Sequence, residues 1–217
     1  MSTALLFELM SSTWQTLYMV AVSGALALIV GLPLGILLFI TRSNQLLPLP
    51  WFNKCLAIVV NAARSIPFII LMLAIIPLTR LLVGTSIGTN AAIVPLTLAA
   101  IPFFARMVEN SLNELSPGLV ETGQAMGASP YQIIHSILLA EAMPGIVNSL
   151  TITLISLVAY SAMAGAVGGG GLGDLAIRYG YQRFDITVML ATIIILITLV
   201  QAIQYIGDNC VRHFTRH

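Results

Sequence analysis

The side chains that could carry chemistry gather in one polar segment of this sequence, at about residues 108–144. The segment holds His135 but no lysine or arginine, and its four acidic residues are Glu109, Glu114, Glu121 and Glu141. Carboxylates and histidines serve acid–base catalysis and metal binding when they cluster. Neither His135 nor the other two histidines, His213 and His217, show a metal-ligand spacing. We therefore expect no metal site and no catalytic residue in this chain.

A glycine-rich run from Gly168 to Gly173 is the second candidate for chemistry. Loops that cradle phosphates end in Lys-Ser or Lys-Thr, whereas this run continues into Asp174. We expect no nucleotide site and no cofactor here. The run is interpreted as a flexible turn that follows a long apolar helix.

The polar segment is patterned as two short helices joined by a turn. Ser116-Pro117 and Ser129-Pro130 each place an N-cap before a proline at the first helical position. Gln132 completes a capping box with Ser129, and Gly127 suits a left-handed helix end. The second helix carries an apolar stripe formed by Ile133, Ile134, Ile137 and Leu138. We expect a surface on which another protein docks; the alternative is a hairpin that packs on the chain's own helices.

The composition places these elements in a membrane protein. Of the 217 residues, 58% are hydrophobic and only 8% are charged, and the mean hydropathy is +0.98. A soluble fold of this size needs far more polar surface, so a soluble enzyme is excluded. The net charge of +1 provides no field for nucleic acid. The two cysteines, Cys55 and Cys210, are expected to stay reduced as small apolar residues.

Long stretches without charge predict an all-α protein with five transmembrane helices. The uncharged stretches 9–41, 81–105, 142–173 and 186–207 each exceed the roughly 20 residues that cross a bilayer. A further apolar stretch is interrupted only by Arg64. The helices are expected near Trp14–Ile40, Ala57–Thr79, Gly88–Met107, Gly145–Val167 and Asp185–Tyr205. Together they form one domain, residues 1–217, with the polar segment as its long loop.

Basic residues predict that the N-terminus lies outside and the C-terminus in the cytoplasm. This orientation places six basic residues inside: Arg42, Lys54, Arg64, Arg106, Arg212 and Arg216. It places three outside: Arg80, Arg178 and Arg183. The polar segment 108–144 is then cytoplasmic.

Small and polar residues mark faces of the helices that meet protein or a pathway. Gly31 and Gly35 form a GxxxG pattern, and Ala162 and Ala166 repeat its spacing, as is typical of close helix packing in membranes. In the fourth helix, the candidates for lining or gating a translocation pathway are Tyr160, Ser161 and Met163. Helix–helix contact in a dimer is the alternative for each.

Arg64 is the charged residue that the expected spans place inside the bilayer. It would lie about 10 Å inside the second helix if that helix began at Ala57. Snorkelling to the cytoplasmic headgroups is the favoured interpretation. Exposure to a cavity between two copies is the other.

The polar segment resembles the EAA signature of ABC importer permeases. The resemblance rests on Glu121-Thr122-Gly123-Gln124-Ala125-Met126-Gly127-Ala128-Ser129 and on Ile137-Leu138-Leu139-Ala140-Glu141-Ala142-Met143-Pro144. Glu121 and Gly127 match the signature in type and spacing. Thr122 and Gly123 replace its two alanines, and Ala140 stands where a proline is usual.

Other segments are similar to amino-acid importer permeases, and to the methionine importer family in particular. They are Arg64-Ser65-Ile66-Pro67-Phe68-Ile69, Ala91-Ala92-Ile93-Val94-Pro95-Leu96, Ala105-Arg106-Met107-Val108-Glu109-Asn110 and Tyr160-Ser161-Ala162-Met163-Ala164-Gly165-Ala166-Val167-Gly168. The resemblance therefore extends over the whole chain.

The resemblance implies a type I ABC importer transmembrane domain in a bacterial inner membrane. It implies a second copy of this chain, two ATPase subunits, a periplasmic or lipid-anchored binding protein and a methionine-like substrate. The coupling contacts would come from Glu121, Gly127, Ala128 and Ser129, with ATP hydrolysis in the partner. A permease for another small amino acid or peptide is the alternative.

An ion-coupled secondary transporter is the alternative from a different class. Such a protein places acidic or charged groups at the membrane midplane. No acidic residue falls inside any expected span of this chain, so that class is disfavoured.

Overall fold

Helices make up almost all of the regular structure. The computed structural model describes residues 3–43 and 45–215. The long helices are α1 (Thr3–Ile40), α5 (Thr89–Asn113), α8 (Leu139–Gly165) and α10 (Ile186–Thr215). The short ones are α2 (Pro50–Ser65), α3 (Phe68–Ala74), α4 (Ile76–Val83), α6 (Gly118–Ala125), α7 (Pro130–Gln132) and α9 (Gly171–Leu175), with two π-helical turns, η1 (Ile133–Leu138) and η2 (Ala176–Tyr181).

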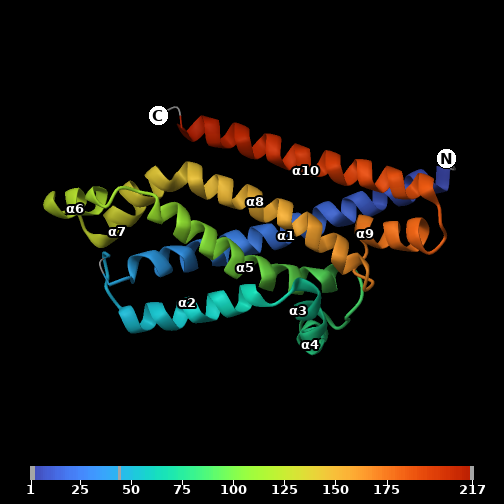
Figure 1. Ribbon diagram of the computed structural model, residues 1–217, viewed down its shortest axis with the longest axis horizontal. Helices are drawn as coiled ribbons and strands as arrows, with labels where there is room; N and C mark the ends of the chain where they lie inside the picture. Colours follow the sequence, from blue (N-terminus) through green and yellow to red (C-terminus); the bar gives the residue numbers. More distant parts are fainter. Residues whose placement is uncertain (1–2, 44, 216–217) are drawn as a thin grey trace.

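The four long helices run along the long axis of the molecule (Figure 1). The short helices α6 and α7 lie together at one end, which we call the α6–α7 end, and α9 lies with the N-terminus at the other, the α9 end. Within the described residues, the four long helices are each long and apolar enough to cross a membrane. The pair α2 and α3 adds a fifth, broken span.

The second expected span is not one helix, and the prediction of a continuous helix over Ala57–Thr79 is wrong. α2 ends at Ser65, and α3 leaves it at 100°. Ile66 between them is extended, with φ −81° and ψ 122°. Pro67 explains the break, because proline disfavours helical backbone at the preceding residue and lacks an N–H. Pro77 then begins α4 in the first turn, where proline is tolerated.

The GxxxG pattern of α1 packs against α5, as its spacing predicted. A Cβ atom added at Gly35 would lie 2.6 Å from the carbonyl oxygen of Ala105, and one at Gly31 would lie 3.0 Å from that of Ile101. Only glycine allows the two backbones to come this close. α1 and α5 therefore form the central pair on which α2, α3 and α8 pack.

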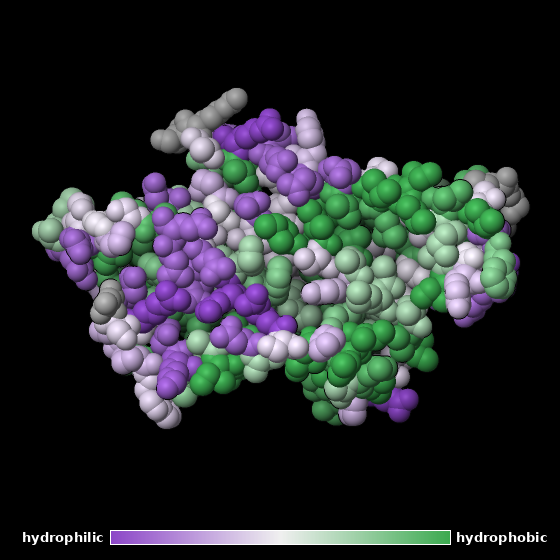
Figure 2. All heavy atoms as spheres, in the orientation of Figure 1, coloured by the Kyte–Doolittle hydropathy of each residue, from purple (hydrophilic) through white to green (hydrophobic). Residues whose placement is uncertain are grey.

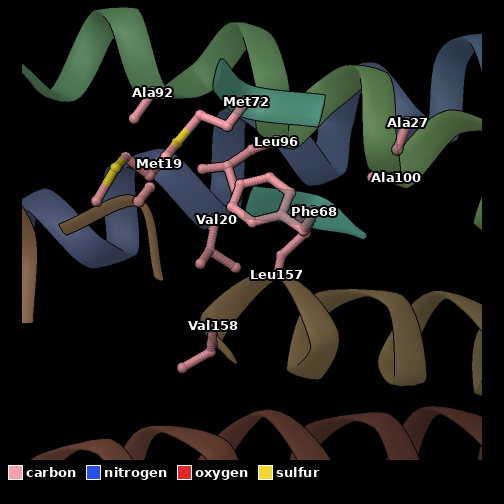
Figure 3. Packing of buried hydrophobic residues seen from close by; sticks show 11 residues of the cluster. Met19, Val20, Ala27, Phe68, Met72, Ala92, Leu96, Ala100, Leu157 and Val158 are labelled. Atoms are coloured by element: carbon pink, nitrogen blue, oxygen red, sulfur yellow. The ribbon is translucent and has the colours of Figure 1, made fainter. Parts of the chain in front are cut away.

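Two buried clusters fill the bundle. The first lies where α1, α3, α5 and α8 meet, with Met19, Phe68, Leu96 and Leu157 among its members (Figure 3). The second joins α1, α5 and α8 to the segment after α6 through Phe39, Phe104, Val108, Ile133 and Leu138. The second cluster therefore fastens the α6–α7 end to the spans by apolar burial.

Candidate functional site

The segment from α6 to η1 is a rigid hairpin whose turn follows from its sequence. Gly127 has φ +76°. Its N–H donates to the Gln124 carbonyl (2.9 Å), and the N–H of Ala128 donates to the Gly123 carbonyl (3.0 Å). These two bonds are the Schellman arrangement that ends a helix at a left-handed glycine.

The second helix of the hairpin begins as the capping box predicts. The Ser129 hydroxyl accepts from the Gln132 N–H (3.4 Å), and the Ser129 N–H donates to Gln132 Oε1 (2.8 Å). The first helix differs, because α6 has Pro117 as its N-cap and no side-chain cap. The expectation of a Ser116 cap is therefore wrong: the Ser116 carbonyl, not its hydroxyl, accepts from the Leu119 N–H (3.1 Å).

The apolar stripe of the hairpin faces the chain's own helices. Ile133 and Leu138 are buried, and Ile134 and Ile137 pack against the same cluster. Gly123 makes this packing possible, because a Cβ there would lie 2.9 Å from Ile137 Cδ1. One residue type at position 123 thus sets how closely α6 approaches η1.

The opposite face of the hairpin is free in this chain. Glu121, Gly127 and Ser129 are exposed on it, whereas Ala128 is half-buried and packs against the same cluster as Ile134 and Ile137. Two large apolar side chains also point outward: Met126 is 72% exposed and Tyr131 is 74% exposed. The expectation of packing on the chain's own helices is confirmed for one face, and docking of another protein on the other face stays a prediction. The buried face packs on the bundle, and the outer face combines a carboxylate, a turn and two large apolar side chains.

Glu109 does not belong to this exposed surface, although the sequence placed it in the polar segment. It lies in α5, is 1% exposed, and accepts from Arg42 (2.6 Å) and from Arg106 (2.5 Å). Arg42 also donates to Asn113 (2.8 Å). A buried carboxylate needs such partners, and removing them is strongly destabilising. The cluster ties the end of α1 to α5 next to the hairpin.

The three pathway candidates of α8 have different surroundings. Tyr160 is half-buried, and its ring stacks on Phe68 of α3 with 4.8 Å between centroids. The Ser161 hydroxyl is buried and donates to the Val158 carbonyl (2.7 Å). Met163 is 47% exposed. Sequence reasoning missed Phe68, whose place beside Pro67 in a break was the available signal.

Arg64 lies deeper than the sequence suggested, because α2 begins at Pro50 rather than near Ala57. At 1.5 Å per residue, about 21 Å of helix separate Arg64 from the start of α2. Its side chain is exposed, and its guanidinium lies 5.9 Å from the centre of the Phe103 ring. The contact with Phe103 of α5 favours exposure to a cavity between two copies over snorkelling, and both interpretations stay predictions.

The glycine run at the α9 end is a tightly packed turn rather than a flexible one. Gly169, Gly171 and Gly173 are buried. Side chains of α1 hold the turn: Gln15 Oε1 accepts from the Gly171 N–H (2.8 Å), and the Thr16 hydroxyl accepts from the Leu172 N–H (2.9 Å). The expectation of flexibility is wrong because these bonds and the close backbone packing fix the run.

Two side-chain pairs beyond this turn close the α9 end. The Tyr179 hydroxyl donates to Glu8 Oε1 (2.9 Å), and this bond, with burial, raises the pKa of Tyr179. Arg178 donates to Asp174 Oδ2 (2.8 Å), which raises the pKa of Arg178. Both bonds fasten η2 to its neighbours, Glu8 in α1 and Asp174 in α9. Within residues 3–43 and 45–215, no three His, Cys, Asp or Glu side chains gather as metal ligands would.

A bundle of membrane-crossing helices with a capped, half-exposed hairpin at one end has the architecture of a type I ABC importer transmembrane domain. Three comparisons agree with this class. The profile of the family described as binding-protein-dependent transport system inner membrane component matches residues 31–216. The chain belongs to this family of ABC importer permeases.

Individual relatives are similar to the chain over most of its length. The chain is 60% identical over 204 residues to a probable D-methionine transport system permease protein MetI of Vibrio cholerae, covering 94% of this chain and 91% of that protein. It is 53% identical over 165 residues to the D-methionine transport system permease protein MetI of Escherichia coli, covering 76% of each.

The structural match is equally extensive. A chain of the MetNI methionine ABC transporter, in an inward-facing conformation, superposes with a TM-score of 0.97 at 51% identity, over 99% of both chains. An amino acid ABC transporter solved with histidines gives 0.77 at 14% identity, over 94% of this chain and 93% of that one. At that identity the second match concerns the fold alone.

Proposed function

We propose that this chain is the permease subunit of an ATP-driven importer that carries methionine, in its L and D forms, across the bacterial inner membrane. The single observation that carries this proposal is the 60% identity to a D-methionine transport permease over nearly the whole chain. The 0.97 superposition on a chain of a methionine ABC transporter supports the same substrate.

The importer would contain two copies of this chain and two ATPase subunits, served by an external binding protein. The hairpin would provide the contact with the ATPase through Glu121, Gly127, Ala128 and Ser129. Support comes from its outer face, where Met126 and Tyr131 are exposed, and the Tyr131 ring stacks on His135 of the same hairpin. The glycine run lacks the Lys-Ser or Lys-Thr ending of a phosphate loop, which supports a separate ATPase.

The pathway would run along α8 and pass Tyr160, Ser161 and Met163 while the two copies alternate their access. The stacked Tyr160 and Phe68 rings support a movable contact there, because they belong to different helices, one of which starts at a break. The α6–α7 end would face the cytoplasm and the N-terminus the periplasm, in accord with the distribution of basic residues.

Methionine uptake tests the proposal directly. A strain that lacks every other route for methionine should accumulate radiolabelled L- and D-methionine when the chain is supplied with its neighbouring ATPase and binding protein. Omitting only this chain should abolish uptake. Unchanged uptake without the chain, or uptake of a different amino acid or peptide instead, would overturn the methionine assignment.

A further inference from the structure

Two measures place Arg64 well along its helices, away from the α6–α7 end. Along α2, Arg64 lies about 21 Å from Pro50. Along α5, its neighbour Phe103 lies ten residues from Asn113, which is about 15 Å of helix. The hydrocarbon core is about 30 Å thick. Figure 1 agrees, since α2 ends near the middle of the long axis.

Within the part of the chain that the structure describes, no carboxylate forms an ion pair with Arg64. Among the described residues, the ion pairs join Arg42 and Arg106 to Glu109 and Arg178 to Asp174. Arg64 has only the ring of Phe103, and its side chain is exposed. Charged side chains inside membrane-spanning helices almost always face the protein interior or a water-filled cavity, and the exposed Arg64 fits the second of these.

A hydrophilic band leads from the α6–α7 end to this depth (Figure 2). Near the middle of the long axis it gives way to a largely hydrophobic surface. On α2, Asn61 and Ser65 are exposed beside Arg64. On α5, Arg106 and Asn110 follow Phe103 at helical spacing on one face. The band thus starts at the α6–α7 end and extends to the part of the long axis where α2 ends.

We propose that Arg64 is a carboxylate-binding subsite in the inner half of the translocation pathway, where it pairs with the α-carboxylate of the amino acid in transit. This proposal rests on the proposed function, which supplies a zwitterionic substrate. A guanidinium fits a carboxylate with two parallel hydrogen bonds. Both L- and D-methionine present that group, so a single arginine serves both.

The surroundings of Arg64 suit the rest of such a substrate. Phe103 offers an aromatic face beside the guanidinium. Four residues beyond Arg64, on the far side of the break, Phe68 is buried and stacks on Tyr160. Thioether sulfur makes favourable contacts with aromatic rings. The pairing is weak enough for release, because water competes for both charges.

Protection of a nearby thiol tests the subsite. Cys55 and Cys210 are replaced by serine, and Asn61→Cys introduces a reporter one turn from Arg64. The complex with its ATPase, without nucleotide, is reconstituted in vesicles and treated from the cytoplasmic side with a membrane-impermeant thiosulfonate. We expect labelling, and we expect methionine to slow it. Methioninol, which lacks the carboxylate, should not protect.

Substitutions of Arg64 test whether protection requires the guanidinium to pair with the substrate carboxylate, or only requires the substrate to lie near the reporter thiol. In the Asn61→Cys background, Arg64→Met should raise the methionine concentration that gives half protection by roughly tenfold or more, whereas Arg64→Lys should retain part of the protection. Ile193→Cys, on the apolar surface of α10, is the control and should not label. If Arg64→Met fails to assemble, the comparison of methionine with methioninol on native Arg64 still decides.

Three results would overturn the subsite: no labelling of Asn61→Cys, equal protection by methioninol, or protection unchanged in Arg64→Met. Failure of the proposed function looks different. In that case the native complex takes up no methionine, and the same protection assay, repeated with other amino acids, reports on the carboxylate subsite by itself.

Discussion

Gly127 combines a backbone conformation that favours glycine with open space around the position of a Cβ atom. Its φ of +76° is unfavourable for other residues, yet nothing in this chain lies within 4 Å of a Cβ added there. Among residues with side chains, asparagine tolerates this backbone best. Substitutions at position 127 therefore cost little packing inside the chain, and a large effect on transport reports a contact outside it.

We expect Gly127→Asp to abolish uptake while the chain still inserts and assembles in the membrane. The carboxylate would add charge and bulk to the face proposed to enter the ATPase. Gly127→Asn, which has the same shape without the charge, is the matched control and should retain more activity. Uptake assays with membrane quantification by immunoblot measure both. Normal uptake by Gly127→Asp would contradict the coupling role.

For single residues, the sequence predicts backbone conformation and helix capping well, but it predicts burial and tertiary contacts poorly. The left-handed Gly127 and the Ser129–Gln132 capping box follow from short-range hydrogen bonding, and both are confirmed. The burial of Glu109 depends on Arg42, which lies 67 positions away. Its i,i+3 spacing to Arg106 was the local hint, but that spacing is equally common on solvated helices.

Among the elements, the turn into α9 is the clearest case of a glycine-rich sequence that is tightly packed in the structure. A Cβ at Gly173 would lie less than 3.0 Å from three backbone atoms of Ala162. The backbone of α8 cannot yield as a flexible side chain would. The same glycines that suggest flexibility in a sequence are here required because two backbones touch.

Gly173→Ala should therefore destabilise the chain by about 3 kcal/mol, at the upper end of the cost of overpacking. Thermal unfolding of the purified complex in detergent, followed by tryptophan fluorescence, measures the loss. Gly118→Ala is the control, because its Cβ would meet only Ser116 Oγ, at 3.7 Å. That variant should be neutral or slightly stabilising. Equal melting temperatures for the two variants would disprove the tight turn.

The existence of the spans was predictable, and the break in the second one was missed. Hydropathy reports apolar length, which is the same for a straight helix and for α2 followed by α3. The sterics of Ile66-Pro67 argue for a break, but membrane helices often retain prolines, since neighbouring helices satisfy the freed groups. The start of α2 was also missed, because Asn53 and Lys54 interrupt the apolar run.

For the whole molecule, orientation follows from charge and from the position of the hairpin. Arg42, Lys54 and Arg106 lie toward the α6–α7 end, and Arg178 and Arg183 lie toward the α9 end. Arg216, which was also counted as cytoplasmic, and His217 lie outside the described residues. Arg64 is left out of this comparison, because it lies in the last turn of α2, away from both ends. The excess of basic residues at the α6–α7 end persists without it.

We therefore expect the C-terminus and the loop after α1 to be cytoplasmic, and the loop between α4 and α5 to be periplasmic. Green fluorescent protein fused after residue 217 should fluoresce, whereas alkaline phosphatase fused there should be inactive. Alkaline phosphatase inserted between Thr85 and Ser86, in the short loop that follows Gly84, should be active. An active C-terminal phosphatase would reverse the topology. It would also place the exposed face of the hairpin in the periplasm, away from ATP, and so contradict coupling through α6 and α7.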